Sequence, residues 1–392
     1  MGEWKEYKLG ELIITNALTI NKKYPYTEIQ YLDTGSITCN KIESYQYYNI
    51  EDAPSRAKRL VKEEDIIYSL VRPNQLHYGF IKFPQKNLVV STGFVTITCK
   101  KEILNPKFLY YYLTQNSVIE YLHTIAEAST SAYPSLKPID IENLDIEIPS
   151  LEEQKRITSI LSSLDEKIDL LHQENKTLEA MAETLFRKWF IEEVKEDWKE
   201  GTLDDILSVK GGTTPSTKEP KYWDGNIPWT SPKDVTTLNG IYLFDTERKI
   251  TQEGLKQISS GLLSAGTLLM SSRAPVGVLA YAEVPLAINQ GYIAIIDDKG
   301  YAKEFIYLWL KANMDMVHSY ANGSTFMEIS KSAFKSLGLL IPPKHIVDEF
   351  CDRIKPIFEK IKINELQIRT INKTKDNILP KLMSNEIKID EL

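Results

Sequence analysis

The chain has 392 residues and a formal net charge of −7, with 42% hydrophobic and 26% charged residues, which is ordinary for folded globular protein. No run of roughly 18 apolar residues occurs, so a membrane span is not expected. The N-terminus does not resemble a signal peptide, and the dispersed Cys39, Cys99 and Cys351 have no metal-ligand spacing. A reduced, cytoplasmic location is therefore predicted.

The negative charge argues superficially against binding to nucleic acid. Most of the acidic excess, however, falls in residues 151–197, and the remaining parts are nearly neutral. A basic face on those parts is therefore compatible with the composition, although composition does not demonstrate one.

The chain contains an internal repeat. The sequence Trp-Lys-Glu at residues 4–6 recurs at 198–200, and a similar succession of segments follows each copy. This period is too long for a solenoid repeat, so it indicates one domain plus one helix used twice. A pseudo-two-fold molecule is expected.

Each copy begins with short β-rich segments. In the first copy residues 11–14 have a strand-like pattern. Residues 64–73 and 265–275 are β-rich runs that each end in an arginine and a proline, so Arg72 and Arg273 are expected where a strand gives way to a turn.

The later segments of the two copies also correspond. Residues 89–94 match 287–292, and the aromatic-rich 107–113 and 304–310 are predicted to form short buried helices. Closing strands are predicted at 144–149 and 337–342, where a proline announces a helix start. Each globular part is therefore expected to be mixed α/β with irregular strands and long loops.

Two long helices follow these closing strands, because apolar residues recur there at alternating steps of three and four. The predicted seams contain Ile157, Leu161, Leu164, Ile168, Leu171, Leu178, Ala182, Leu185 and Trp189, and then Phe350, Ile354, Ile357, Ile361, Ile368, Ile371, Ile378 and Leu382. Such a heptad pattern predicts a coiled coil, with an ordinary surface helix as the alternative. Pro356 and Pro380 are expected to kink or locally break the second helix.

The relative direction of the two helices follows from their polar seam positions. In an antiparallel register every seam residue of one helix faces a seam residue of the other, and Asn175 then faces Asn364. Two facing amides can satisfy each other, whereas an amide facing Leu or Ile cannot. An antiparallel coiled coil is therefore predicted.

Catalytic motifs are not recognisable. The sequence has neither a G-x-x-x-x-G-K-[ST] phosphate loop nor a nucleophile elbow. His77, His123, His172, His318 and His345 show no metal-ligand spacing. We therefore expect no catalytic residue, no metal and no cofactor on this chain.

The predicted loops do carry side chains suited to contacts with DNA. Guanidiniums suit guanine edges or phosphates, amides suit adenine edges, and hydroxyls and ammoniums on turns suit phosphates. The candidate DNA-binding residues are Arg56, Lys58, Arg59, Arg72, Asn74, Gln75, Ser129 and Thr130 in the first copy, and Thr213, Thr214, Ser216, Lys218, Ser231, Lys233, Arg273, Asn289, Gln290, Ser324 and Thr325 in the second. The alternative for each is a local salt bridge or a turn-capping role.

Several motifs of the second copy together resemble a known family. They are Gly-Gly-Thr-Thr-Pro-Ser at 211–216, Asn-Ile-Pro-Trp-Thr-Ser-Pro-Lys-Asp at 226–234, Ser-Ser-Arg-Ala-Pro-Val-Gly at 271–277, Asn-Gln-Gly at 289–291, Gly-Ser-Thr at 323–325 and the junction Ile-Pro-Ser-Leu-Glu-Glu-Gln at 148–154. This pattern resembles the specificity (S) subunit of type I restriction–modification enzymes, over essentially the whole chain. The first copy lacks the Gly-Gly-Thr and Pro-Trp segments, and the second junction at 341–345 lacks Leu-Glu-Glu-Gln.

The resemblance implies target recognition domains at 1–150 and 196–343, each reading half of a bipartite, asymmetric sequence in double-stranded DNA. It implies that conserved helices at 151–195 and 344–392 form the spacer. The chain itself would be non-catalytic. Its partners would be two methyltransferase subunits, which carry S-adenosylmethionine, and restriction subunits, which use ATP and Mg²⁺.

Two other functions are compatible with parts of the sequence. A coiled-coil scaffold that binds proteins but reads no DNA would show the same seams. An enzyme with a cryptic site is a further possibility, which the missing motifs disfavour.

Overall fold

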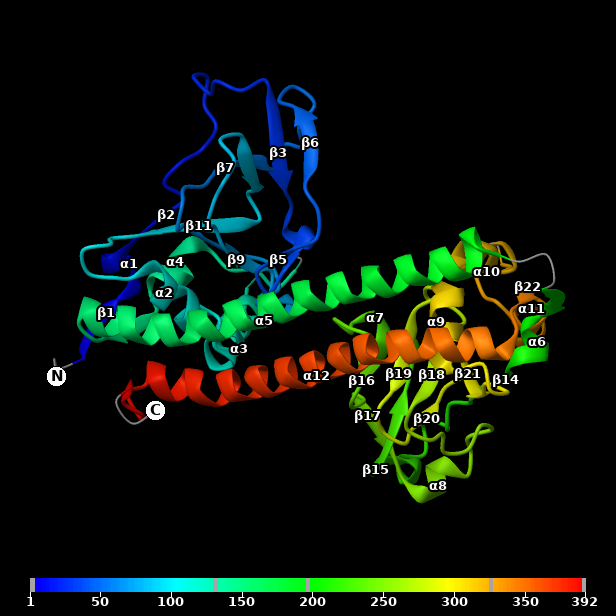
Figure 1. The fold of residues 1–392 in the computed structure, drawn as a ribbon. Coiled ribbons are helices and arrows are strands. Elements are labelled where there is room, and N and C mark those ends of the chain that lie inside the picture. The colour runs from blue at the N-terminus through cyan, green and yellow to red at the C-terminus, as the bar shows by residue number, and fades with distance from the viewer. Residues whose placement is uncertain (1–3, 130–132, 195–197, 324–326, 390–392) are drawn as a thin grey trace. The chain divides into compact units, whose positions relative to one another are not determined.

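The computed structural model describes residues 4–129, 133–194, 198–323 and 327–389 (Figure 1). The chain divides into two compact units. Unit 1 comprises Met1–Lys167 with Ile371–Leu392, and unit 2 comprises Ile168–Thr370. Each unit has its own mixed α/β body and contains part of each of two long helices, α5 (Leu151–Arg187) and α12 (Lys344–Met383).

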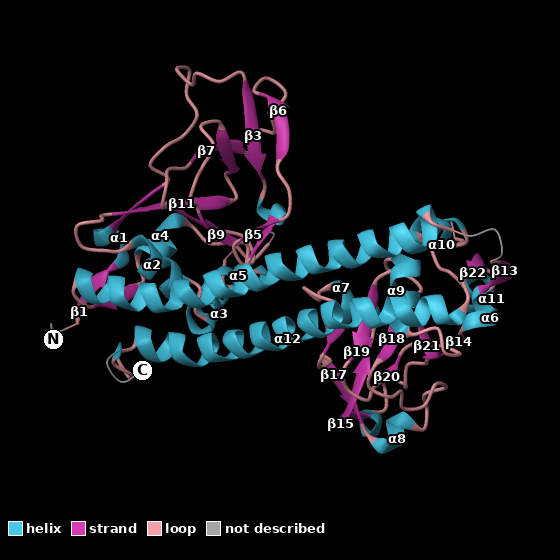
Figure 2. Ribbon diagram, in the orientation of Figure 1, coloured by secondary structure: helices cyan, strands magenta, loops and turns pink. Residues whose placement is uncertain are grey.

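Unit 1 contains two four-stranded sheets, in the orders β2-β11-β8-β9 and β6-β3-β10-β7, and the antiparallel pair β1–β12 (Figure 2). The strands are β1 (Lys5–Lys8), β2 (Ile13–Thr15), β3 (Glu28–Leu32), β6 (Gln46–Asn49), β7 (Ala57–Leu60), β8 (Ile66–Ser69), β9 (Tyr78–Phe80), β10 (Leu88–Ser91), β11 (Phe94–Cys99) and β12 (Asp145–Ile148), with a small hairpin of β4 (Ile37–Thr38) and β5 (Lys41–Ile42). The short helices are α1 (Leu9–Leu12), α2 (Pro106–Leu113), α3 (Asn116–Glu127) and α4 (Pro138–Glu142), with 3₁₀ turns η1 (Thr34–Ser36) and η2 (Pro73–Gln75).

Unit 2 contains a five-stranded sheet, β14-β21-β18-β19-β16, a three-stranded sheet, β17-β15-β20, and the antiparallel pair β13–β22. The strands are β13 (Lys199–Thr202), β14 (Ser208–Lys210), β15 (Trp223–Thr230), β16 (Tyr242–Leu243), β17 (Arg248–Ile250), β18 (Thr267–Ser271), β19 (Leu279–Ala282), β20 (Ala287–Ile288), β21 (Tyr292–Asp297) and β22 (Gly338–Ile341). The helices are α6 (Leu203–Ile206), α7 (Pro232–Thr236), α8 (Gln252–Leu255), α9 (Lys303–Ala312), α10 (Met314–Ser319) and α11 (Lys331–Lys335), with the 3₁₀ turn η4 (Pro220–Tyr222) and the π-helical segment η3 (Lys188–Glu192).

The two units share one strand topology. The order β2-β11-β8-β9 in unit 1 corresponds to β14-β21-β18-β19 in unit 2. The parallel pair β3–β10 corresponds to β15–β20, and β1–β12 corresponds to β13–β22. The internal repeat expected from the sequence is therefore present in the strand topology.

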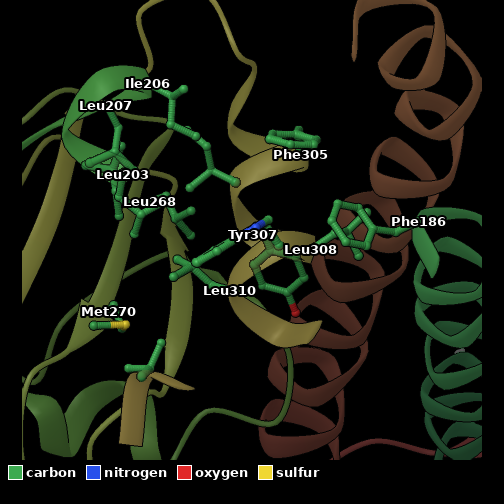
Figure 3. Close-up of a cluster of buried hydrophobic side chains, with 14 of the residues drawn as sticks. Phe186, Leu203, Ile206, Leu207, Leu268, Met270, Phe305, Tyr307, Leu308 and Leu310 are labelled. Atoms are coloured by element: carbon green, nitrogen blue, oxygen red, sulfur yellow. The ribbon is translucent and has the colours of Figure 1, made fainter. Parts of the chain in front are cut away.

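The aromatic helix of each copy is buried against its sheet. Phe108 of α2 is 0% exposed and Phe305 of α9 is 1% exposed, in agreement with the predicted buried helices. In unit 2 the cluster around α9 also receives Phe186 from α5 and side chains from α6 and β18 (Figure 3). Burying an aromatic side chain of this kind contributes about 1.5–3 kcal/mol, so α9 is a main anchor between the sheet and the long helices of this unit.

Within unit 2 the two long helices run in opposite directions. Trp189 near the end of α5 contacts Phe350 near the start of α12, with ring centroids 5.7 Å apart. Further along, Nδ2 of Asn364 donates to Oδ1 of Asn175 at 2.8 Å. In unit 1 the first turns of α5 and the last turns of α12 share one apolar cluster, which contains Ile157 and Leu382.

Three local expectations need correction. Residues 11–14 are not all strand, because Leu9 and Leu12 are buried three residues apart and form the helical turn α1 before β2 begins at Ile13. Local breaks at Pro356 and Pro380 are absent from α12, which the packing of buried residues on either side of each proline keeps helical. The third concerns the seam residues at the end of α5.

The seam at the end of α5 differs from the heptad pattern. Phe186 and Phe190 are 2% and 8% exposed, whereas the predicted seam residues Leu185 and Trp189 are only half-buried. The segment Lys188–Glu192 is π-helical, so its hydrogen bonds span one more residue than those of an α-helix. Phe190 in this segment packs against Phe350, with 4.9 Å between ring centroids. A regular heptad could not predict this change of face.

Candidate nucleic-acid interface

In unit 2, loops from three strands meet at one place. Strands β15 and β20 are parallel and pair Thr230 with Ile288, so their carboxyl ends coincide and the next residues, Ser231 and Asn289, lie side by side. The Asn289 N–H donates to the Thr230 carbonyl at 3.0 Å. Strand β18 ends beside them, and Ser272 N–H donates to the Gly291 carbonyl at 2.8 Å, which brings Arg273 to the same loop cluster.

The loop at residues 211–218 packs against this cluster. A Cβ on Gly212 would lie 1.8 Å from the Ile288 carbonyl oxygen, so only glycine permits this approach to β20. Thr214 Oγ1 donates to Gln290 Oε1 at 2.7 Å, which joins two of the candidate loops directly. The structure therefore brings Thr213, Thr214, Ser231, Asn289 and Gln290 together from segments that are far apart in the sequence.

Some of these side chains serve their own turns. Thr213 Oγ1 donates to the Gln257 carbonyl at 2.7 Å and accepts from Ser259 N–H at 3.1 Å. Asn289 is 9% exposed, and its Oδ1 accepts from Gly291 N–H at 2.8 Å. The exposed side chains of this loop cluster include the candidates Thr214, Ser216, Lys218 and Gln290.

Ser231 is the N-cap residue of α7. Its N–H donates to Oδ2 of Asp234 at 2.8 Å, and its carbonyl accepts from the Tyr292 hydroxyl at 2.6 Å. Burial raises the pKa of Tyr292 well above its ordinary value, so this hydroxyl stays protonated and remains a donor. Lys233, in the first turn of α7, is exposed and forms an ion pair with Glu247 at 2.7 Å.

Arg273 forms a long ion pair with Glu328, with 3.7 Å between Nη1 and Oε2. The side chains of Arg273 and Glu328 are 35% and 46% exposed, so solvent screens the pair. An exposed pair of this kind contributes about 0–1 kcal/mol, so Arg273 can exchange Glu328 for another acceptor at little cost.

The sheet register shows which residue of unit 1 stands where Arg273 stands in unit 2. Phe94 of β11 pairs with Ser69, and Tyr292 of β21 pairs with Ser271. Counting onward from these serines, Val71 takes the position of Arg273, and both form an isolated bridge, with Ser135 and Glu328 respectively.

Arg72 is therefore offset by one residue from Arg273. It takes the position of Ala274, and both have a left-handed backbone, with φ of 48° and 56°. The Arg and Pro shared by the two segments suggest that Arg72 and Arg273 are equivalent. The register of the strands, however, is set by backbone pairing and not by the identity of the side chains.

The remaining unit 1 candidates near Arg72 lie on η2 and at the end of α3. The Arg72 guanidinium lies over the Tyr133 ring, 5.3 Å from its centroid. Asn74 and Gln75 are exposed in η2. Ser129 is half-buried, and its Oγ accepts from Ser135 N–H at 3.3 Å. Thr130, like Ser324 and Thr325 in unit 2, lies outside the described residues.

The basic candidates of unit 1 lie in a different sheet. Lys58 and Arg59 are in β7, which pairs with β10, and Arg56 immediately precedes it. Arg56 and Lys58 are exposed, whereas Arg59 is half-buried and its Nε has no hydrogen-bond partner among the described residues. The candidates of unit 1 therefore form two groups.

A turn that the sequence reasoning missed lies between these two groups. Thr92 N–H donates to the Arg56 carbonyl at 2.8 Å, and the Gly93 carbonyl accepts from Leu70 N–H at 2.8 Å. Ser91 Oγ accepts from Gly93 N–H at 3.2 Å, as Asn289 Oδ1 does from Gly291. Ser91 and Thr92 are thus the counterparts of Asn289 and Gln290, and the match of 89–94 with 287–292 was the signal that could have identified them.

The described residues contain neither a cluster of three or more His, Cys, Asp or Glu side chains arranged to hold a metal ion nor a helix long and apolar enough to cross a membrane.

Comparison with known proteins agrees with the internal repeat. The family model described as the type I restriction modification DNA specificity domain matches residues 1–180 and again 195–373. The HindI specificity subunit of Haemophilus influenzae is 26% identical over 465 aligned positions that cover 99% of this chain and 100% of that one. The MjaIX specificity subunit of Methanocaldococcus jannaschii is also 26% identical, over 91% of this chain and 87% of its own.

A solved structure has the same fold. The type I restriction–modification S subunit from M. genitalium superposes with a TM-score of 0.56 at 16% identity, over 97% of this chain and 96% of that one. Because the family model matches nearly the whole length in two copies, this chain belongs to the type I restriction–modification DNA specificity family.

Proposed function

We propose that this chain is the non-catalytic subunit that gives a type I restriction–modification enzyme its DNA specificity, with each unit reading one half of a bipartite target. One observation carries the proposal most directly. The two units keep the same strands but present different residues at the same strand ends, Val71 against Arg273 and Thr92 against Gln290. A constant frame with changed loop side chains is suited to two different half-sites.

The proposal extends to the organisation of the chain. Target recognition domains at 1–150 and 196–343 are joined by helices at 151–195 and 344–392, which form an antiparallel coiled coil that separates the half-sites. The opposed helix contacts within unit 2 and the amide pair of Asn175 and Asn364 support this register. At 1.5 Å per residue, the 37 residues of α5 and the 40 residues of α12 span roughly 55 and 60 Å.

The proposed partners are double-stranded DNA, two methyltransferase subunits that carry S-adenosylmethionine, and restriction subunits that use ATP and Mg²⁺. Exposed apolar side chains on the unit 2 parts of the long helices support protein docking there. They are Leu170 and Met181 on α5, at 57% and 50% exposure, and Ile363 and Leu366 on α12, at 58% and 42%. Ile363 and Leu366 are three residues apart and so lie on one face of α12, and exposed apolar groups that adjoin one another are typical of protein interfaces.

The test uses the full chain assembled with its methyltransferase partner. Methylated adenines are first mapped in the genome of a host that carries the system, which defines the target. Electrophoretic mobility shifts then compare the target duplex with duplexes of random sequence. Selective retention of the target is expected. Retention without sequence selectivity would instead support the protein-scaffold alternative.

A further inference from the structure

Arg248 has an unusual environment in unit 2, because its guanidinium lies over two buried indole rings. It lies on β17 directly opposite Trp229 of β15. Its guanidinium carbon is 3.5 Å from the centroid of the Trp223 ring and 5.5 Å from that of Trp229. The two indoles pack edge to face at 5.1 Å, and they are only 7% and 4% exposed. The two indoles beneath Arg248 are therefore held rigidly by their packing.

The guanidinium N–H donors of Arg248 have no acceptor among the described residues. Nearby cations have carboxylate partners, Lys233 with Glu247 at 2.7 Å and Lys249 with Asp245 at 3.6 Å. Arg248 is exposed, and across the described residues its guanidinium has neither an ion pair nor a hydrogen bond. Stacking uses the face of a guanidinium and leaves its in-plane N–H groups available, so Arg248 presents oriented donors to an outside acceptor.

The same two indoles hold the candidate loop at residues 211–218. Trp223 Nε1 donates to the Ser216 carbonyl at 3.1 Å, and Trp229 Nε1 donates to the Thr213 carbonyl at 3.4 Å. The loop therefore meets the edges of the indoles while Arg248 covers the face of Trp223. The guanidinium and the backbone of this loop therefore share the same two indoles, and the exposed side chains of the loop include those of Thr214, Ser216 and Lys218.

We infer that Arg248 contacts a DNA phosphate in the half-site read by unit 2, and that Trp223 and Trp229 are positioning residues for both Arg248 and the adjoining loop. The inference rests on the proposed function. A fixed guanidinium binds a phosphate through charge-assisted, often bidentate, hydrogen bonds. Hydroxyls and an ammonium on a neighbouring turn are the usual companions of such a contact. Arg248 therefore contributes to affinity and orientation, and the loop contributes to selection by holding Gln290, whose Oε1 accepts from Thr214 Oγ1.

The experiment measures DNA binding by the complex of the full chain with its methyltransferase partner, across a range of salt concentrations, on the mapped target duplex and on duplexes altered in either half-site. For Arg248→Ala we expect binding roughly tenfold weaker on all of these duplexes, because one charge-assisted contact is lost. The slope of log affinity against log salt should fall by about one. Arg248→Lys should retain most of that slope.

Two variants serve as comparisons. Lys249→Ala removes the neighbouring cation of the same strand, which is already paired, and should leave affinity and salt slope unchanged. Trp223→Phe keeps an aromatic ring beneath Arg248 but removes the N–H that holds Ser216. It should reduce selection at the unit 2 half-site without changing the salt slope. Circular dichroism and partner assembly establish that each variant is folded.

The possible failures are distinguishable. If the wild-type complex does not bind its target selectively, the proposed function fails, and this inference fails with it. If the wild type binds selectively but Arg248→Ala has the same affinity and salt slope, only the inference is overturned. A loss for Arg248→Ala that depends on the base at one position would show a base contact and overturn the phosphate assignment.

Discussion

The amide of Asn364 meets that of Asn175 in the interior of unit 2, where Nδ2 donates to Oδ1 at 2.8 Å. The two residues are 0% and 6% exposed. The same Nδ2 also donates to Oε2 of Glu174 at 2.9 Å. A shift of one helix along the other would place these amides against Ile or Leu, so this contact makes one register of the helix pair more favourable than its neighbours.

Asn175→Ala should destabilise unit 2, because it removes one of the two acceptors of the buried Asn364 amide. We expect a loss of about 1–3 kcal/mol. Asn175→Leu combined with Asn364→Leu should recover much of this loss while weakening the choice of register. Urea unfolding followed by circular dichroism measures the loss and the recovery of stability. Asn377→Ala, at an exposed position of α12, is the control. Equal midpoints for Asn175→Ala and this control would show that the amide pair contributes nothing.

Glu365 gives the stability of unit 2 a specific pH dependence. The carboxylate is 7% exposed and accepts from the N–H groups of Ile241 and Tyr242 at 2.9 and 3.1 Å. Burial, aided by the nearby Glu179 and Glu283, raises the pKa of Glu365 from 4.5 to about 7. The folded protein therefore holds this proton more tightly than the unfolded chain, so stability from this group is full below pH 4.5 and declines as the pH rises to about 7.

Glu365→Gln should remove that decline. Relative to the wild type, the variant should gain up to about 3 kcal/mol between pH 5 and pH 8, from about 1.4 kcal/mol for each pKa unit. Urea midpoints measured at several pH values test this expectation. Glu359→Gln, on an exposed turn of the same helix, should run parallel to the wild type. If Glu365→Gln also runs parallel, the carboxyl of Glu365 does not titrate in this range.

Arg273→Ala should weaken selection at one half-site only. Its ion pair with Glu328 is long and exposed, so the stability of unit 2 should change by less than about 1 kcal/mol. Binding of duplexes altered separately in each half-site measures the effect. Glu328→Gln releases Arg273 from its partner and should leave selection intact. An equal loss of selection at both half-sites would mean that Arg273 has a structural role.

Gly212→Ala should displace the loop at 211–218, because the new Cβ would collide with the Ile288 carbonyl. We expect a destabilisation of about 1–3 kcal/mol, typical of overpacking, together with lost selection at the unit 2 half-site. Thermal unfolding and duplex binding measure the two effects. Gly35→Ala, where an added Cβ meets nothing within 4 Å, is the matched control. Normal selection by Gly212→Ala would contradict a recognition role for this loop.

Much of the frame could be predicted from local patterns. The long helices follow from apolar residues spaced by three and four, and each begins two residues after a proline, at 149 and 342 respectively. The buried helices around Phe108 and Phe305 follow from their aromatic spacing. The facing of Asn175 and Asn364 followed from the heptads alone, because a helix presents its residues at regular angles.

The details of the candidate interface depended on contacts between distant segments. Sheet register decided that Val71, and not Arg72, stands where Arg273 stands. The packing of Trp223 and Trp229 places Arg248 over the face of Trp223 and holds the loop at residues 211–218 at the edges of both indoles. Helical periodicity is a property of neighbouring residues and is visible in the sequence, whereas strand register and side-chain stacking arise only when segments far apart in the chain exclude water from the same core.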